Sequence, residues 1–215
     1  MLKYDNEQLI HWMDGIRENP DMVNCFWASQ IHSKEWLVQH VPIDVEHIVI
    51  FGSWYGILAD MLKEWNPFWK IICTDIDQNC VDWTSQYHES ICTSMDSYTY
   101  TIPPNLVINT VTEHVEQEVY DEWFDNIPDK TYFLLQGNND FNEKDHIRNA
   151  HTLEEFNKLN RADNISYTGE LEYEGPWNMK ENKPTYYKRF MTVGIKNGRE
   201  DKSRGNKISF LMRCS

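Results

Sequence analysis

The chain of 215 residues is 40% hydrophobic and 13% aromatic, which is enough to bury a core and excludes a chain that is disordered throughout. Its net charge of -14 argues against broad binding to nucleic acid, because an acidic body repels the phosphate backbone. The apolar runs are short and the N-terminus has no apolar leader, so we expect neither a membrane span nor a signal peptide.

The first part of the chain predicts two helices that break near "ENPDM". In the second, "VNCFWASQIHSKEWLVQHV", the side chains of Phe26, Gln30 and Lys34 recur at i, i+4 spacing and share one face. We expect residues 1–44 to form a helical addition that packs on the domain that follows.

Strands and helices then alternate along the chain. Strands are expected at residues 47–52, 69–75, 105–110 and 131–137, and helices at 55–65, 77–89, 114–125 and 152–160. Asp77 is placed to cap the second of these helices, and Thr152 and Glu155 have the spacing of a capping box. The alternation predicts an α/β fold in which helices cover both faces of a parallel sheet, making a three-layer sandwich.

The last two strands are expected to differ from the others. Residues 165–175 and 185–196 alternate polar and apolar side chains, which predicts an antiparallel hairpin with a long connection. We therefore expect one domain over residues 45–196 and a basic tail over residues 197–215. The stretch from Lys183 to Ser215 holds nine Lys or Arg and two Asp or Glu, so it either binds a polyanion or is simply solvated.

Three features fall at the ends of the expected parallel strands, where α/β sheets bind ligands. Gly52 and Gly56 frame a loop after the first strand, where glycine lets the backbone turn sharply and approach a ligand. Asp75 ends the second strand 23 residues after Gly52, the spacing of an acid that binds ribose hydroxyls. Asp96, in "TSMDSY", is expected where a third strand ends, and its carboxylate can accept a hydrogen bond from an adenine amine.

With these motifs the sequence resembles the class I S-adenosylmethionine-dependent methyltransferases over roughly residues 45–196. The stretches that carry the resemblance are "IVIFGSWYG", "IICTDID", "SMDSY", "LVINTVTEHV", "TYFLLQGNND" and "YYKRFMTVGIK". More narrowly, the chain is similar to small single-domain methyltransferases found in bacteriophage genomes. The resemblance implies a Rossmann-like fold with a seven-stranded, mostly parallel sheet whose last strand is antiparallel, and S-adenosyl-L-methionine as the cofactor.

The resemblance also implies where the cofactor lies, with Asp75 at the ribose, Ile76 beside the adenine and Asp96 at the adenine amine. The first loop departs from the family pattern, since Trp54 replaces the middle glycine and Ile50 replaces an acid. This loop therefore either binds the cofactor or packs Trp54 into the core. The cofactor-binding residues expected are Gly52, Ser53, Trp54, Tyr55, Gly56, Asp75, Ile76, Asp96 and Asn109.

The expected methyl-transfer site follows the fourth strand, with Asn109 at its tip and Glu113 and His114 at the start of the next helix. An imidazole titrates near neutral pH and suits a base that takes a proton from the acceptor, and Glu113 could orient it or accept from a substrate amine. The alternative is that Glu113 caps the helix and His114 packs against the cofactor. Asn109 does not begin the Asn-Pro-Pro-Tyr motif of amino-methylating DNA enzymes, which argues against a nucleic-acid base as acceptor.

Polar side chains after the fifth strand are expected to bind the acceptor. Gln136, Asn138 and Asn139 follow this strand directly, and His146 lies a few residues on. The alternative is an ordinary polar loop built from turn-forming residues. Lys34 on the N-terminal addition is a further substrate-binding candidate, because such additions often form the acceptor wall in this family.

We therefore expect a methyltransferase that acts on a nitrogen or oxygen atom of a small polar molecule or a protein group. The alternatives are another enzyme that uses or cleaves S-adenosylmethionine, an NAD-dependent oxidoreductase, a nucleic-acid base methyltransferase, or a non-catalytic binding protein. No HxxxH or HExxH motif is present, so no metal site is expected. The five cysteines form no CxxC pair, which predicts reduced thiols and a cytoplasmic protein, and no sequence feature specifies an oligomeric state.

Overall fold

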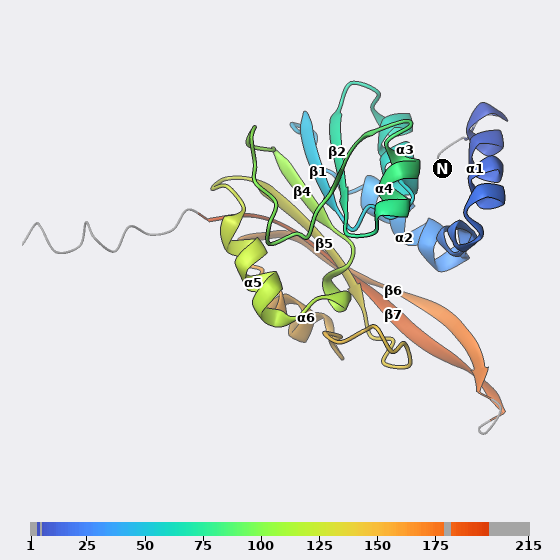
Figure 1. The fold of residues 1–215 in the computed structure, drawn as a ribbon. Coiled ribbons are helices and arrows are strands. Elements are labelled where there is room, and N and C mark those ends of the chain that lie inside the picture. Colours follow the sequence, from blue (N-terminus) through green and yellow to red (C-terminus); the bar gives the residue numbers. More distant parts are fainter. Residues whose placement is uncertain (1–3, 5, 179–181, 198–215) are drawn as a thin grey trace, which may run out of the picture.

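A seven-stranded mixed sheet forms the centre of the molecule in the computed structural model, which describes residues 4, 6–178 and 182–197 (Figure 1). The strand order is β3-β2-β1-β4-β5-β7-β6, and β7 runs antiparallel to both of its neighbours. This confirms the expected α/β fold with an antiparallel last strand. The strands are β1 His47–Phe51, β2 Lys70–Asp75, β3 Glu89–Cys92, β4 Leu106–Asn109, β5 Tyr132–Asn138, β6 Ile165–Asn178 and β7 Lys183–Ile195.

Helices cover both faces of the sheet, as expected for a three-layer sandwich (Figure 1). Alternate residues of β1 show why: Ile48 and Ile50 join the core cluster that contains α3, whereas Val49 and Phe51 join the cluster that contains α5 and α6. Because side chains alternate across a strand, one continuous apolar run supplies two cores. The helices are α1 Asn6–Glu18, α2 Ala28–Val38, α3 Ile57–Trp65, α4 Gln78–Thr84, α5 Gln117–Asn126 and α6 Leu153–Leu159, with the 3-10 helices η1 Pro20–Phe26 and η2 Thr112–His114.

The N-terminal helices pack on the α3 side of the sheet through buried contacts. Trp12 of α1 is buried, and its Nε1 donates to Oδ2 of Asp60 on α3 at 2.7 Å. The other carboxylate oxygen of Asp60 lies 2.7 Å from Nε2 of His88. A buried carboxylate with several partners holds α1 in a defined orientation, because each lost partner would leave a charged group unsatisfied.

The helix expected across residues 23–41 is divided at Trp27. The backbone of Trp27 is extended, with φ -60° and ψ 142°, and it separates η1 from α2. Phe26 and Lys34 therefore lie on different helices, contrary to the expectation that they share one face. The helix expected at residues 114–125 is divided in the same way, so that Glu113 and His114 lie on η2 ahead of α5.

Both expected helix caps are present. The Asp77 side chain accepts from the backbone N of Asn79 at the start of α4. Thr152 accepts from the backbone N of Glu155 at the start of α6. However, α4 ends at Thr84 rather than near residue 89, because the chain turns there to begin β3. Strand β3 also ends at residue 92, so Asp96 lies in the turn beyond it and not at the strand end itself.

Strands β6 and β7 form a ribbon that extends beyond the rest of the sheet (Figure 1). β7 pairs with β5 over residues 189–195, whereas its pairing with β6 covers residues 183–194. This confirms the expected hairpin. The expected basic tail lies, from residue 198 onwards, outside the described residues. Within residues 4, 6–178 and 182–197, no helix has the length and apolar character needed to cross a membrane.

Candidate cofactor and acceptor site

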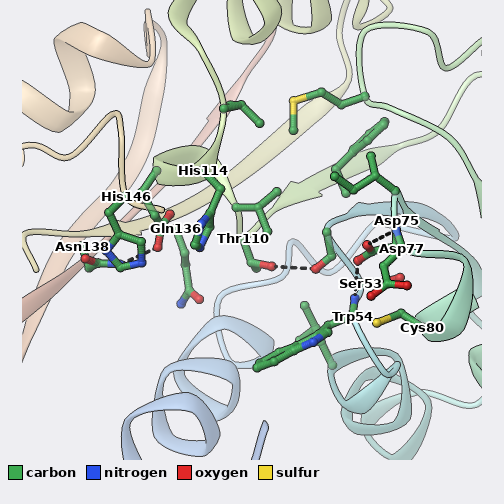
Figure 2. Close-up of a pocket in the computed structure, with 18 of the residues that line it drawn as sticks. Ser53, Trp54, Asp75, Asp77, Cys80, Thr110, His114, Gln136, Asn138 and His146 are labelled. Carbon is green, nitrogen blue, oxygen red and sulfur yellow. Dashed lines mark hydrogen bonds between the residues drawn. The ribbon is translucent and has the colours of Figure 1, made fainter. Parts of the chain in front are cut away.

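A cavity of about 940 Å³ lies at the carboxyl ends of β1, β2, β4 and β5. Parallel strands place these ends at one edge of the sheet, so the loops that follow them meet there. Figure 2 shows Trp54, Asp75 and Asp77 at one end of the cavity, and His114, His146 and Asn138 at the other. We call these the loop end and the acceptor end.

The loop after β1 keeps left-handed backbone conformations at both of its glycines. Gly52 has φ 71° and Gly56 has φ 81°, and a Cβ on Gly52 would lie 2.2 Å from a methyl carbon of Val111. Trp54, which stands where the family pattern has a glycine, also has a positive φ of 50°. The backbone therefore keeps a glycine-like path despite the bulky side chain, at a cost in strain.

The side chain of Trp54 contacts both the cavity and the core. It lines the cavity, and it also packs against the larger core cluster. Its backbone N donates to Oδ2 of Asp75 at 2.8 Å, and its carbonyl accepts from Oγ1 of Thr84 at 3.1 Å. The tryptophan thus narrows the cavity without filling it.

Asp75 joins the loop after β1 to the loop after β2. Oδ2 accepts from the backbone N of Trp54, and Oδ1 accepts from the backbone N of Asp77 at 3.0 Å. A carboxylate oxygen has more than one lone pair, so each oxygen can still accept from a ligand hydroxyl. Next to it, Ile76 lines the cavity and is 76% exposed, and Asp96 lines the same space.

The acceptor end is built from η2 and the loop after β5. Glu113 is buried, and its carboxylate accepts from Nδ2 of Asn138, whereas the Thr112 hydroxyl, 3.4 Å away, donates to the carbonyl of Gln136 at 2.8 Å. His114 is exposed, and its Nδ1 lies 3.2 Å from the carbonyl oxygen of Asp145. Glu113 therefore contacts the Asn138 amide and not the imidazole of His114, so it does not orient that ring.

Two further candidates bring polar groups to this end from opposite walls. Gln136 lines the cavity, and its Nε2 donates to the carbonyl of Ser33 on α2 at 2.8 Å. His146 lines the cavity too, and its ring centroid lies 4.7 Å from that of His114. No sequence pattern indicated that these two imidazoles would lie together.

Helix α2 supplies a positive charge to the cavity wall. Lys34 lines the cavity and donates to Oε1 of Gln30 at 2.8 Å. Burial, together with a smaller effect of the Arg189 guanidinium, lowers the pKa of Lys34 to about 8. Arg189 of β7 also lines the cavity, and its buried Nε has no hydrogen-bond partner among the described residues. Sequence reasoning missed Arg189, because only the pairing of β7 with β5 brings it here.

Four of the expected site residues lie outside the cavity lining. Asn109 is fully buried, and its Oδ1 accepts from the backbone N of Val111, so it shapes the turn before η2. Asn139 bonds the backbone of Lys188 through both its N and its Oδ1. The remaining two, Tyr55 and Gly56, pack in the core and cap α3, respectively.

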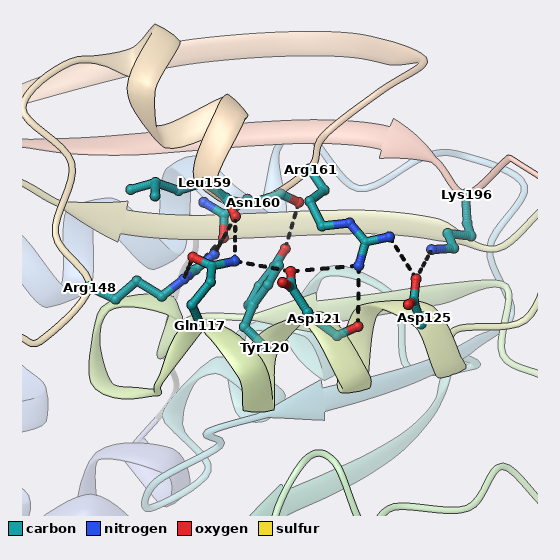
Figure 3. Close-up of polar contacts among 9 residues, drawn as sticks. All are labelled: Gln117, Tyr120, Asp121, Asp125, Arg148, Leu159, Asn160, Arg161 and Lys196. Carbon is teal, nitrogen blue, oxygen red and sulfur yellow. Dashed lines mark hydrogen bonds and ion pairs between the residues drawn. The ribbon is translucent and has the colours of Figure 1, made fainter.

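A buried arginine holds the acceptor-end loop in place (Figure 3). Arg148 donates to Oε1 of Gln117, the carbonyls of Thr112 and Leu159, and Oδ1 of Asn160. Its guanidinium carbon also lies 3.9 Å from the ring centroid of Tyr120. Arg148 thereby joins the loop that carries His146 to η2, α5 and the end of α6.

No protein-family model matches the sequence, and no curated protein matches it either. Solved structures do match. The N-methyltransferase NodS from Bradyrhizobium japonicum WM9, in complex with S-adenosyl-L-homocysteine, aligns with a TM-score of 0.61 at 11% identity, over 86% of this chain and 98% of that chain. The YcgJ protein from Bacillus subtilis aligns with a TM-score of 0.59 at 13% identity, over 78% and 99%.

A SAM-dependent methyltransferase from Archaeoglobus fulgidus aligns with a TM-score of 0.55 at 12% identity, over 76% of this chain and 93% of that chain. At such low identity these matches concern the fold, and they give no support to the narrower likeness to bacteriophage enzymes. The strand order, the antiparallel β7 and these structural matches agree. The chain has the Rossmann-like fold of class I S-adenosylmethionine-dependent methyltransferases.

Proposed function

We propose that this protein is a methyltransferase that uses S-adenosyl-L-methionine and methylates a nitrogen or oxygen atom of a small polar molecule, with a protein group as the alternative acceptor. The observation that carries the proposal is the junction between the left-handed loop at residues 52–56 and the Asp75 carboxylate. This junction lies in a cavity beside the point where the strand order reverses between β1 and β4.

The residues of the loop end fit this cofactor. The Val111 side chain occupies the place where a Cβ of Gly52 would lie, so only glycine fits here, and its left-handed backbone lets the loop turn sharply at the edge of the cavity. Asp75 retains lone pairs for two ribose hydroxyls. Ile76 offers an exposed apolar surface for a purine ring, and the Asp96 carboxylate can accept from its amine.

When bound, S-adenosylmethionine supplies an electrophilic methyl group on its sulfonium sulfur. His114 can take the acceptor proton, because its Nδ1–H donates to the carbonyl of Asp145 and leaves the lone pair on Nε2. Lys34 and Arg189 place positive charge on the wall of the same cavity, which favours an acceptor that carries an anionic group.

Calorimetric titration with S-adenosylmethionine, S-adenosylhomocysteine and NAD tests the proposal. We expect binding of the first two and not of NAD. Asp75→Asn should weaken binding of S-adenosylhomocysteine by about 1–3 kcal/mol, which is roughly ten- to hundredfold. Asp82→Asn is the matched control, because Asp82 is exposed on α4 outside the cavity and its substitution removes the same charge. Absence of binding to either S-adenosyl compound would overturn the proposal.

A further inference from the structure

Three side chains at the acceptor end form a group that can ligate a metal ion. The carboxylate of Glu113 and the imidazole nitrogens of His114 and His146 offer ligand atoms that all lie within 4.8 Å of one another. Figure 2 shows the rings of His114 and His146 next to each other, beside Asn138. The three residues also line the cavity, so an ion bound there would face its interior.

Both histidines are held in a tautomer that leaves one ring nitrogen free to bind a metal ion. Nδ1 of His114 lies 3.2 Å from the carbonyl oxygen of Asp145, and Nδ1 of His146 lies 2.9 Å from that of Asp140. A carbonyl oxygen can only accept, so in both rings the hydrogen is on Nδ1 and the lone pair is on Nε2. Metal-binding histidines in proteins commonly donate their other N–H to a backbone carbonyl in this way.

The Glu113 carboxylate is buried, and its short hydrogen bond comes from the uncharged amide of Asn138. It is 3% exposed, and it forms no ion pair with any residue in the described part of the chain. Arg148 is near enough to interact with it electrostatically, but its N–H groups donate to other acceptors. A buried anion is costly unless it is paired or binds a metal, and a cation in the cavity would provide a positive charge in direct contact with it.

Backbone hydrogen bonds hold His146, which is distant in the sequence, close to Glu113 and His114. The carbonyl of Glu113 accepts from the backbone N of Ile147 at 2.9 Å and of Arg148 at 3.1 Å. These bonds fix the loop of His146 against η2, although the two histidines are 32 residues apart in the chain. Neither HxxxH nor HExxH spacing applies to such a site, which is why the sequence indicated no metal.

We propose that Glu113, His114 and His146 bind one divalent transition-metal ion. Two imidazoles and one carboxylate are the ligands of open zinc and non-haem iron sites, in which the remaining positions stay free for water or substrate. Bonds of about 2.1 Å in a tetrahedral site place ligand atoms about 3.4 Å apart, so the three side chains must close slightly on binding. The exposed ring of His114 has the freedom to do so.

The ion also specifies the class of acceptor, and this step rests on the proposed function. A metal at this place binds an acceptor through oxygen and lowers the pKa of a bound hydroxyl. The hydroxyl proton leaves to solvent, the oxygen lone pair forms the bond to the methyl carbon, and the electrons of the broken carbon–sulfur bond stay on sulfur. In this arrangement His114 is a metal ligand and not the base, and the acceptor is a hydroxyl compound.

Metal titrations of the full chain test the site itself. After treatment with EDTA and its removal, the protein is titrated by calorimetry with Zn²⁺, Mn²⁺ and Mg²⁺ in separate runs. We expect one equivalent of Zn²⁺ to bind, Mn²⁺ to bind more weakly and Mg²⁺ weakest, because two of the ligands are imidazoles. His146→Ala and Glu113→Gln should each weaken Zn²⁺ binding by at least tenfold.

The matched control is His151→Ala, which removes an exposed histidine that stacks on Phe141 and does not line the cavity. Thermal unfolding of each variant shows that it is folded. Zn²⁺ binding that is equally strong in His146→Ala and the wild type would overturn the proposal, as would the absence of stoichiometric binding in the wild type.

Titration with S-adenosylhomocysteine in the presence of EDTA separates this inference from the proposed function. If the S-adenosyl compound binds and Zn²⁺ does not, the metal site is wrong and the proposed function stands. If Zn²⁺ binds and the S-adenosyl compound does not, the metal site stands and the assignment of its acceptor falls.

Discussion

Replacing Arg148 with methionine tests whether this single side chain holds the acceptor end together. Methionine keeps an unbranched apolar stem against Tyr120 but removes every donor of the guanidinium. Four acceptors then lose a charged partner: Oε1 of Gln117, Oδ1 of Asn160, and the carbonyls of Thr112 and Leu159. Each unsatisfied buried acceptor costs about 1–3 kcal/mol, and these costs are not additive because water re-enters.

We expect Arg148→Met to lower the free energy of unfolding by about 3–5 kcal/mol, the range seen when one member of a buried charged cluster is removed. Arg161→Met is the matched control, because Arg161 pairs with Asp121 and Asp125 at the surface in the same region (Figure 3). Its side chain is 41% exposed, so its loss should cost less than about 1 kcal/mol. Both variants remove one positive charge, so the effect of net charge cancels.

Urea unfolding at pH 7, followed by both circular dichroism and tryptophan fluorescence, measures the difference. Coincident transitions with unchanged m-values would show that the two variants can be compared as two-state systems. Equal destabilisation by Arg148→Met and Arg161→Met would refute the reasoning, because it would mean that the buried hydrogen bonds contribute no more than surface ion pairs.

Three further predictions concern the cavity wall. Because Lys34 has a pKa of about 8 against an ordinary value of 10.5, the unfolded chain binds more protons between these values, and stability should rise with pH across that window. Lys34→Met should remove this rise and increase the free energy of unfolding by about 1–3 kcal/mol at pH 7, measured by urea unfolding. If the stability of Lys34→Met depended on pH as that of the wild type does, the charge of Lys34 would not be buried. Trp54→Gly should be more stable than Trp54→Ala by about 1 kcal/mol in thermal unfolding, because only glycine relieves the positive φ of 50°, and the reverse order would contradict the strain. Gly52→Ala should lower both the stability of the protein and its affinity for S-adenosylhomocysteine, because the new Cβ would lie 2.2 Å from a Val111 methyl carbon. Adding Val111→Ala should restore part of the stability, and no recovery in the double variant would mean that the positive φ of Gly52 alone determines the loss.

Most residues at both ends of the cavity were predictable from the sequence, whereas the contacts among those at the acceptor end were not. Gly52 and Asp75 follow continuous apolar strands, and a parallel sheet brings such strand ends together whatever the loops do. His146 lies beside His114 because backbone hydrogen bonds hold an irregular loop in place, and such a loop has no sequence periodicity that would predict the contact. Asn109 was expected at the methyl group, but it is buried and its Oδ1 accepts from the backbone N of Val111 two residues on, as Asn often does in turns.

Helix boundaries were missed where no breaker residue marks them. Trp27 interrupts the N-terminal helical pattern with an extended backbone, although tryptophan has no strong preference for that role. The contribution of Arg189 could not be predicted either, because it depends on a non-local strand pairing across 51 residues, from Asn138 to Arg189. Local patterns specify elements, but they do not specify which distant side chains share a cavity.

The β6–β7 ribbon forms part of one wall of the cavity, and its backbone hydrogen bonds should open less readily from its outer end toward the sheet. Residues 189–194 of β7 pair with both β5 and β6, whereas within the sheet the residues before Lys188 pair with β6 and not with β5. Two-stranded ribbons are marginal by themselves, so amide hydrogen exchange should be fast at the outer part and slow from Arg189 inward. Tyr187 and Arg189, which both line the cavity, stand on the two sides of that boundary. We therefore expect local opening of the ribbon to reach the cavity at Tyr187 and to stop at Arg189, so that this wall can yield to an entering acceptor.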